Sequence, residues 1–392
     1  MFRVQRLREV AAEGGGEGTT YLALTEQQLS EGAVSPRLAE FCCYYSNRMS
    51  YAEVARLVER MTGRRRCLLS GQSIQRLVIS KAASVSERWA EEVVAGKEEE
   101  APVPLVVQEE VDFYDAQADE VLLMADAIQV KRQKAKRGGP QQQQQQQQQQ
   151  PVPKQEERVR VSTDVWLLER AQGDGSFEAI TAGIGEEDGT EVVSAEERVR
   201  WCLRTEYGER LGRPEEPLPI VAIADGAKAI RSSLESIFGR SVPMILDWYH
   251  LKKKVGELMS MVAKDKQEKE RHLEVLLGRL WRGQVQESVR YILMEVEARN
   301  EEKKEALVGY LEKHRGEIID YERRSKRAGK TIGSGRVEKG VDQAIGARQK
   351  KKGMSWSEVG SKALGILKVV EMNQCWEELW FSEEKEEEEA AA

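Results

Sequence analysis

One segment limits the fold of this chain more than any other: the apolar run over residues 218–224, which ends in Asp225 and Gly226. A near-continuous apolar run of this length is typical of a buried strand. A carboxylate at the end of such a strand costs desolvation energy unless it is paired or binds a metal ion. The run therefore predicts a buried strand that presents a chemically important acid.

Four other segments have the pattern of strands: residues 121–130, 158–167, 177–184 and 242–247. Apolar residues at helical spacing predict two intervening helices, over residues 191–211 and 227–238. The resulting order, β-β-β-α-β-α-β, is that of an α/β domain with a mixed sheet. In this order the first and fourth strands lie side by side. We therefore expect Asp126, in the first strand, to meet Asp225 at the end of the fourth.

The first 100 residues are predicted to be helical and to bind DNA. Ser50, followed three residues later by Glu53, has the pattern of a capping box that begins a helix. A second short helix is predicted over residues 69–78. Two helices joined by a turn, with a polar face on the second, are typical of a helix-turn-helix reader of the DNA major groove. The polar side chains of that face are Gln72, Gln75 and Arg76.

Composition divides the rest of the chain into segments. Residues 101–119 are acidic and contain prolines, which indicates a linker. Residues 140–153 combine ten consecutive glutamines with flanking prolines and are predicted to be a disordered expansion of a hairpin loop. Residues 251–325 are charged and have apolar residues at helical spacing, and residues 382–392 form an acidic tail.

The composition also excludes several classes of protein. The chain has 392 residues and a formal net charge of −7, and no apolar run approaches a membrane span of about 18–20 residues. With no signal-peptide core either, it is expected to be cytoplasmic and associated with the nucleoid. Its five cysteines form no C-x-x-C pair, and it has no P-loop, which argues against a zinc ribbon and an ATP-driven motor. Of its three histidines, His272 and His314 lie in charged helical segments and are expected at the surface.

Three acids predict a site for metal ions. Asp126 and Asp225 belong to strands, and Glu338 begins a helix after a glycine-rich stretch. Their oxygens are hard ligands that suit Mg²⁺ or Mn²⁺. Two such ions held by three acids can activate a nucleophile and stabilise the leaving oxygen in phosphoryl transfer. A single strand-end aspartate is more often a turn or cap residue, so the prediction depends on all three acids together.

Four short motifs in this order resemble bacterial insertion-sequence transposases of the ribonuclease-H-like DDE class: residues 223–227, 246–250, 332–338 and 352–356. The resemblance covers residues 120–380 and implies a catalytic core over residues 120–250 and 326–381, interrupted by a helical insertion over 251–325. It implies a ribonuclease-H-like mixed sheet and a metal-dependent transposase whose acid triad is Asp126, Asp225 and Glu338. Asp247 and His250 match the D-x-x-H signature of the Mutator-like relatives. This match implies that both organise the active site or contact the DNA, although Asp247 can instead cap the helix that His250 enters.

The chain departs from the family at the first acid. Asp126 is followed by Ala127, where the family usually has Asp-Gly. Asp164, on the second strand, is therefore the alternative first acid. The glutamine tract lies close to this strand pair in sequence, so an impaired copy of the enzyme also stays open.

Basic residues near Glu338 are expected to contact DNA phosphates and to make binding dependent on salt. They are Arg327, Lys330, Arg336, Lys339, Arg348, Lys350, Lys351 and Lys352. Trp248 and Trp356 could stack on a splayed base, but packing in the core is the more common role of tryptophan.

These features predict a DNA transposase that cleaves phosphodiesters at the ends of an insertion sequence and transfers the freed strand. Because the element has two ends, a homodimer or larger assembly on DNA is expected. Two alternatives stay open. One is a decayed transposase that binds DNA without catalysis, and the other is a ribonuclease-H-like nuclease without strand transfer.

Overall fold

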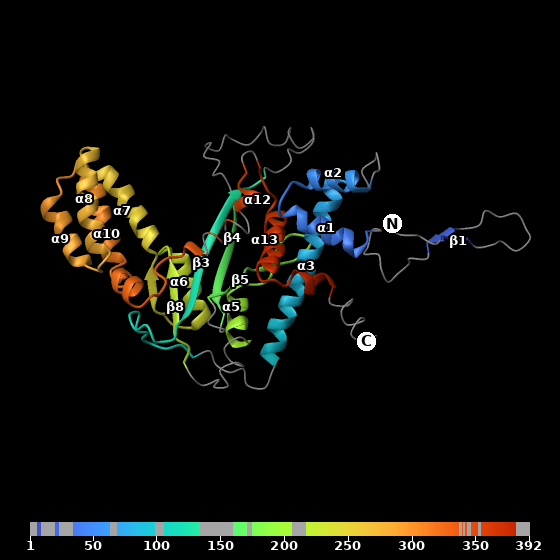
Figure 1. Cartoon of the computed structure of the whole chain (residues 1–392), viewed down its shortest axis with the longest axis horizontal. Coiled ribbons are helices and arrows are strands. Elements are labelled where there is room, and N and C mark those ends of the chain that lie inside the picture. Colours follow the sequence, from blue (N-terminus) through green and yellow to red (C-terminus); the bar gives the residue numbers. More distant parts are fainter. Residues whose placement is uncertain are drawn as a thin grey trace, which may run out of the picture. The chain divides into compact units, whose positions relative to one another are not determined.

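The computed structural model describes residues 6–8, 20–22, 34–62, 69–98, 106–133, 160–170, 175–205, 217–336, 339, 342, 346–351 and 354–381 (Figure 1). The chain divides into two compact units. The first comprises Met1–Lys81 and Gln374–Ala392, and the second is Ala82–Asn373. The boundary falls inside a helix, whereas the composition had suggested a boundary near residue 100.

Three helices of the first unit share one apolar core. They are α1 (Pro36–Ser46), α2 (Tyr51–Thr62) and the beginning of α3 (Gly71–Glu98). Cys42 of α1, Val54 and Val58 of α2, and Ile74 of α3 are buried against one another. The predicted capping box is present, since the Glu53 N–H donates to the Ser50 hydroxyl at 3.3 Å and the Ser50 N–H donates to the Glu53 carboxylate at 2.8 Å. A short antiparallel ribbon, β1 (Arg6–Arg8) and β2 (Thr20–Leu22), precedes these helices.

The prediction of a short second helix was wrong, because α3 runs for 28 residues. Its buried residues continue at helical spacing beyond Val78, through Ala82, Val85, Trp89 and Val93. A helix ends where its apolar face ends or where a residue breaks it, and neither happens before Gly96. Residues 63–68, which contain the predicted turn, lie outside the described residues.

The second unit contains a five-stranded mixed sheet in the order β5-β4-β3-β8-β9. Its strands are β3 (Val121–Lys131), β4 (Arg160–Glu169), β5 (Phe177–Ile180), β8 (Ile220–Ala224) and β9 (Met244–Leu246). β3, β4 and β5 pair antiparallel, whereas β3, β8 and β9 pair parallel. The mixed α/β class and the pairing of the first predicted strand with the fourth are therefore confirmed.

Helices cover the sheet. α5 (Ala195–Leu203) and α6 (Lys228–Phe238) form one core with alternate residues of the strands, including Leu123, Ala125, Ile220 and Ala222. α13 (Glu358–Met372) also packs on β4 and β5, but none of its residues belongs to that core. The sheet is thus buried between helices, which explains its nearly continuous apolar strands.

The bounds of two elements differ from those that the sequence predicts. The third strand stops at Ile180, and β6 (Gly183–Ile184) instead pairs with β7 (Glu191–Val193) in a separate ribbon. The helix predicted from residue 191 begins at Ala195, because Ser194 and Glu197 form a capping box there.

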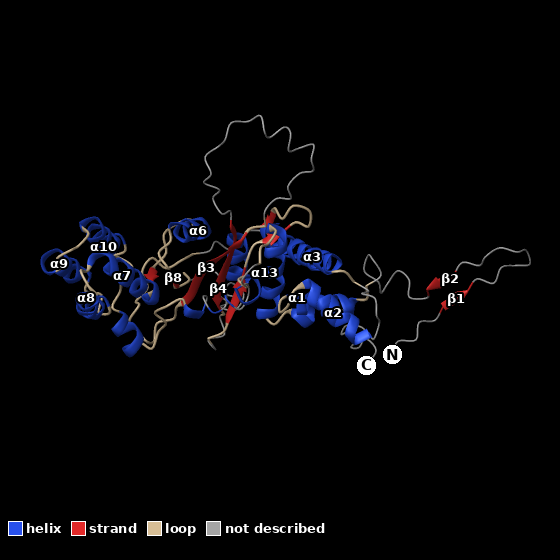
Figure 2. Cartoon of the chain, turned by 90° about the horizontal axis from the view of Figure 1, so that it is seen from above, coloured by secondary structure: helices blue, strands red, loops and turns tan. Residues whose placement is uncertain are grey.

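The predicted helical insertion consists of four helices: α7 (Trp248–Val262), α8 (Lys266–Leu280), α9 (Val285–Glu295) and α10 (Glu301–Lys313). They pack in sequence, and α10 closes the group against α7 (Figure 2). Asp265 and Asn300 cap α8 and α10. Beyond the bundle, the described residues include a π-helical turn, η2 (Arg323–Arg327), and the short α12 (Ala347–Gln349).

The remaining predictions concern the linker, the glutamine tract with the acidic tail, and membrane-spanning helices. Residues 106–119 are not a free linker, because Val107 is buried in the main core and pairs with Leu218. The glutamine tract and the acidic tail lie outside the described residues. Among helices in the described segments, none combines the length and apolar character that a membrane crossing needs.

The thiols of α1 provide a test of this packing. Burial, aided by the charge of Glu40, raises the pKa of Cys42 to about 12, and burial also raises the pKa of Cys43. At pH 8 the reactive thiolate of Cys42 should be about a thousandfold rarer than in the unfolded chain. We expect iodoacetamide to alkylate the half-buried Cys375 before Cys42 and Cys43, as measured by peptide mass spectrometry, and these three thiols to react alike in urea. Equal rates for Cys42 and Cys375 in the native protein would contradict the described packing.

Candidate functional site

Strand register brings three aspartates to one level of the sheet. Met124 of β3 pairs with Ile223 of β8, so Asp126 and Asp225 each lie two residues beyond that pair. Ala224 of β8 pairs with Leu246 of β9, and Asp225 and Asp247 directly follow that pair. Three neighbouring parallel strands thus place an aspartate at the same height, which is where open α/β sheets carry their ligand sites.

Asp126 is half-buried, and its surroundings destabilise the ionised form of its carboxylate. Burial raises its pKa, the N–H of Ala127 opposes this shift, and the charge of Asp225 raises the pKa further. The cationic forms of His250 and Lys350 act in the opposite direction. Two carboxylates that repel each other at a partly desolvated sheet edge are a donor set that fits a divalent cation.

Asp225 is exposed at the end of β8 and also forms a turn. Its Oδ1 accepts a hydrogen bond from the N–H of Ala227 at 2.7 Å. Gly226 between them has a φ of +83°, which side-chain-bearing residues rarely adopt. Asp225 therefore both follows the strand and forms the turn, and the turn fixes the direction of its carboxylate.

Asp247 is fully buried and joins three pieces of the chain. It caps α7, since its Oδ1 accepts the His250 N–H at 2.7 Å, and it lies 3.3 Å from His250 Nδ1. Its Oδ2 accepts hydrogen bonds from the N–H and, at 2.9 Å, from the hydroxyl of Ser334. Burial alone would raise the pKa of Asp247, but the hydrogen bonds from His250 and Ser334 outweigh it and lower that pKa. Capping by Asp247, one of the two roles considered from the sequence, is therefore present.

The bond to Ser334 anchors the segment that leads to the third predicted acid. Ser334 is followed directly by helical residues at Gly335 and Arg336. Glu338, four residues after Ser334, lies outside the described residues. Among the residues that the structure describes, no group of three or more His, Cys, Asp or Glu side chains is placed to hold a metal ion.

The alternative first acid, Asp164, belongs to the other face of the sheet. It pairs with Ala127, whereas Asp126 pairs with Val165, and opposed residues share a face while successive residues alternate. Burial raises the pKa of Asp164, and so do the charges of Glu196 and Glu191, which flank it on that face. Asp126 is therefore the acid that shares a face and a level with Asp225.

The turn at Gly226 rests on a buried network from the helical bundle, which the sequence analysis missed. The expectation that His314 lies at the surface was wrong, because it is 2% exposed. Its Nδ1 lies 2.8 Å from the carboxylate of Glu317 and 3.0 Å from the guanidinium of Arg231. A Cβ on Gly226 would come within 2.6 Å of the His314 ring. His272 is likewise buried, 2.8 Å from the Tyr291 hydroxyl.

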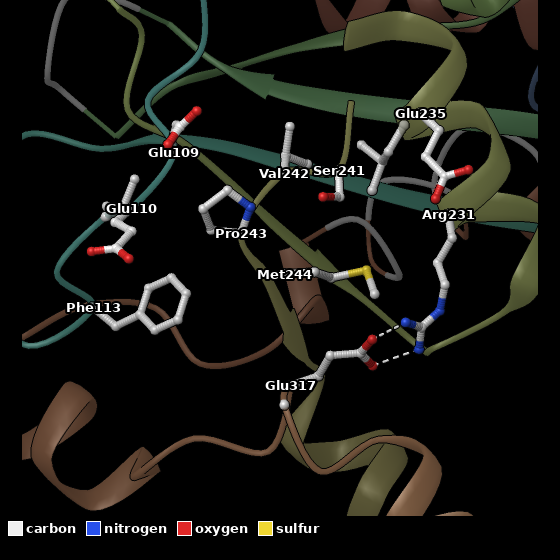
Figure 3. A pocket seen from close by; sticks show the side chains of 13 residues that line it. Glu109, Glu110, Phe113, Arg231, Glu235, Ser241, Val242, Pro243, Met244 and Glu317 are labelled. Carbon is white, nitrogen blue, oxygen red and sulfur yellow. Dashed lines mark hydrogen bonds and ion pairs between the residues drawn. The ribbon is translucent and has the colours of Figure 1, made fainter. Parts of the chain in front are cut away.

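Arg231 and Glu317 form a bidentate ion pair beside a pocket of about 640 Å³ (Figure 3). Apolar side chains such as Leu234, Pro243 and Met244 line much of this pocket. Asp126, Asp225 and Asp247 are not among the residues that line it, so it is separate from the candidate site. Both members of this ion pair also contact Nδ1 of His314 and so help to fix its ring.

Tyr310 of α10 is close enough to Asp225 and Asp247 for their charges to act on its hydroxyl. Burial raises its pKa to about 12, and the charges of Asp225, Glu317 and Asp247 add to the shift. A phenol held neutral beside carboxylates can donate a hydrogen bond but not accept a proton. No pattern in the sequence pointed to Tyr310, because its neighbours come from other strands and helices.

The predicted DNA contacts divide into exposed and buried cations. Arg327, Arg336, Lys339, Lys350 and Lys351 are exposed. In contrast, Lys330 pairs with Glu120 at 3.1 Å and its side chain is 10% exposed, and Arg348 is 3% exposed and stacks over Trp356. These two cations are used inside the protein. Lys352 lies outside the described residues.

The polar face predicted to read DNA bases, on the N-terminal part of α3, is partly exposed. Gln72 and Arg76 are exposed on α3, and Gln75 is half-buried. Trp248 packs against Trp281 and Tyr321 at ring distances of 4.8 and 5.1 Å, and Trp356 is 7% exposed. Trp356 is therefore buried, and Trp248 is half-buried against its aromatic neighbours.

The C-terminal half of the chain is similar to a protein family. The model of an uncharacterised protein family, UPF0236, matches residues 195–385. The matched region begins at α5 and includes Asp225, Asp247, His250 and Glu338, but not Asp126. No curated protein matches the chain.

Replacing Asp247 with alanine tests its structural role. The variant leaves the buried donor of Ser334 without its acceptor and removes a helix cap, so we expect the free energy of unfolding to fall by about 2–4 kcal/mol in urea titrations. Because the folded pKa of Asp247 is lowered, its stabilisation is present above its unfolded pKa of about 3.9 and is lost as the pH falls through the folded value. The difference between wild type and variant should therefore shrink below about pH 4.

Asp265→Ala is the matched control. Asp265 caps α8 through the Glu268 N–H at 2.8 Å, but it is exposed. Its loss should cost only about 1 kcal/mol. Equal losses for the two variants would contradict the anchoring role of Asp247.

Two glycines with positive φ separate backbone strain from contact with His314. Gly226→Ala and Gly239→Ala both force alanine into left-handed backbone, at a cost of about 1–2 kcal/mol. Only at Gly226 does the new methyl group meet His314 and Leu246, whereas Gly239 has open space. We expect Gly226→Ala to lower the unfolding free energy more than Gly239→Ala, and His314→Ala to reduce that difference. If the two glycine variants unfold alike, His314 does not pack on the turn as described.

Proposed function

We propose that this protein is a DNA transposase that cleaves phosphodiesters at the ends of a mobile element with a divalent metal ion and transfers the freed strand. One observation carries the proposal. Register places Asp126 and Asp225 at one level on neighbouring strands, and Asp247 on the next strand binds the backbone four residues before Glu338. The segment bearing the third acid is thereby tied to the edge that bears the first two.

The sheet supports the same proposal. Three antiparallel strands followed by two parallel ones, with the first strand in the centre, is the arrangement expected of a ribonuclease-H-like core. Helices on both faces and a helical insertion after the fifth strand agree with it. Of the four motifs that resemble DDE transposases, residues 223–227 and 246–250 lie at the ends of β8 and β9.

Asp126, Asp225 and Glu338 would hold Mg²⁺ or Mn²⁺. When bound, such ions activate a water or 3′-hydroxyl nucleophile and stabilise the leaving oxygen. The turn at Gly226 orients Asp225, while Asp247 orients the helix start that leads to Glu338. His250, 33% exposed and beside Asp126, can donate a hydrogen bond to a phosphate oxygen or position one of the acids.

DNA would be bound by two regions. The exposed face of α3, with Gln72 and Arg76, would read base edges, as in a helix-turn-helix formed with α2. The exposed cations Arg336, Lys339, Lys350 and Lys351 would neutralise phosphates near the acids. Two element ends need two active sites, so we propose that the protein acts as a homodimer or larger assembly on DNA.

Cleavage by acid variants tests the proposal. With Mg²⁺ or Mn²⁺ and DNA carrying the element ends, Asp126→Asn, Asp225→Asn and Glu338→Gln should each cut about a thousandfold more slowly or worse, because each removes a metal ligand. Asp164→Asn is the matched control on the other face of the sheet and should cut close to the wild-type rate. Anisotropy measurements should show that all variants still bind the DNA.

Other outcomes separate the rival functions. A wild-type protein that binds DNA, binds no Mn²⁺ in calorimetry and never cuts would be a non-catalytic DNA-binding protein. Preferential cleavage of RNA–DNA hybrids or branched DNA without strand transfer would indicate a nuclease. Acid variants that cut at the wild-type rate would refute the proposed site.

A further inference from the structure

One aromatic side chain at the candidate site has no role in packing the protein interior. Tyr249 is 59% exposed. Among the large apolar side chains that the described residues leave exposed, it is the only aromatic one; the others are valine, leucine and methionine. An exposed aromatic ring next to a catalytic centre presents a flat apolar surface to a ligand.

The position of Tyr249 is fixed by the residues on both sides of it. It lies in the first turn of α7, two residues after Asp247 and directly before His250. His250 is close enough to Asp126 to lower its pKa. The ring of Tyr249 therefore stands within one helical turn of the groups that surround the acids.

Gly333 provides a close contact for the ring. A Cβ at Gly333 would lie 2.8 and 2.9 Å from Cδ2 and Cε2 of Tyr249. Only a glycine leaves room for the ring there, and the same loop continues to Ser334, which Asp247 holds. One edge of the ring is thus supported while more than half of the side chain stays exposed.

The neighbouring aromatics explain why Tyr249 is not needed in the core. Trp248 packs with Trp281 and Tyr321, and the Tyr321 hydroxyl donates to the carbonyl of Leu246 at 2.8 Å. Tyr321 is fully buried and the two tryptophans are half-buried, so this cluster packs the start of α7 without the ring of Tyr249, which is 59% exposed.

Charge around Tyr249 suits a nucleic acid. Lys252, Lys253 and Lys254 follow on α7 and are exposed, and Lys350, whose charge acts on Asp126, is exposed as well. Cations that neutralise phosphates, combined with an aromatic ring that stacks on bases, are the two components of sites for unpaired nucleic-acid strands.

We propose that Tyr249 stacks on an unpaired base of the DNA strand beside the cleaved phosphodiester and holds that strand open at the acids. This inference rests on the proposed function, since it takes DNA as the substrate. It assigns Tyr249 the binding of a base rather than a part in the chemical step.

The test uses the full-length protein with the Asp225→Asn substitution, which prevents cleavage. The probe is a duplex with a short splayed end that carries 2-aminopurine at the junction, compared with the same duplex fully paired. Stacking on Tyr249 should quench 2-aminopurine fluorescence. Tyr249→Ala should lose the quenching and bind the splayed duplex about tenfold more weakly, because base–aromatic stacking is worth about 1–3 kcal/mol. It should bind the paired duplex as before.

Two further variants make the result specific. Tyr249→Phe keeps the ring and should keep both quenching and affinity. Met294→Ala removes an apolar side chain that is 77% exposed on α9 and should change neither. Equal quenching and affinity in Tyr249→Ala and Tyr249→Phe would overturn the stacking role and leave the proposed function intact. If the parent protein binds neither duplex, both the inference and the proposed function fail.

Discussion

The buried carboxylate of Asp247 is the interaction on which the candidate site depends. A fully buried charge is costly, and it is stable here because the backbone N–H of His250 and two donors of Ser334 satisfy it. These bonds join the end of β9, the start of α7 and the loop before Glu338. The junction of β9 with α7 and the loop at Ser334, 87 residues further along the chain, therefore meet at one side chain, and loss of that side chain would remove the bonds that join them.

The helical bundle is part of the site rather than an appendage. His314, which directly follows α10, packs against Gly226, and Tyr310 on the same helix lies beside Asp225 and Asp247. Arg231 of α6 and Glu317 hold His314 from the other side. A movement of α10 relative to the sheet would thus change the surroundings of Asp225 directly.

The basic stretch around residues 323–339 contains both buried and exposed cations. Arg324 is fully buried and donates to Glu120, which Lys330 also contacts, so this part of the basic stretch anchors the segment before β3. Arg327, Arg336 and Lys339 stay exposed and are available to a polyanion. A buried arginine that is paired with a carboxylate fixes the segments it joins and is not available to a ligand.

The sequence by itself determined the strands, their order and the pairing of the strands that carry Asp126 and Asp225, because apolar periodicity and chain order restrict how a sheet can be built. It also predicted that Asp247 could cap α7, since capping is a local interaction. It did not show that Asp126 rather than Asp164 faces Asp225, that α3 continues for 28 residues, or that His314, Tyr310 and Ser334 belong to the site. Those facts depend on which face a strand presents and on contacts between distant segments, such as Asp247 and Ser334, which are 87 residues apart. Only tertiary packing decides such contacts, because the same residue pattern is compatible with either face of a sheet and with many arrangements of the helices around it.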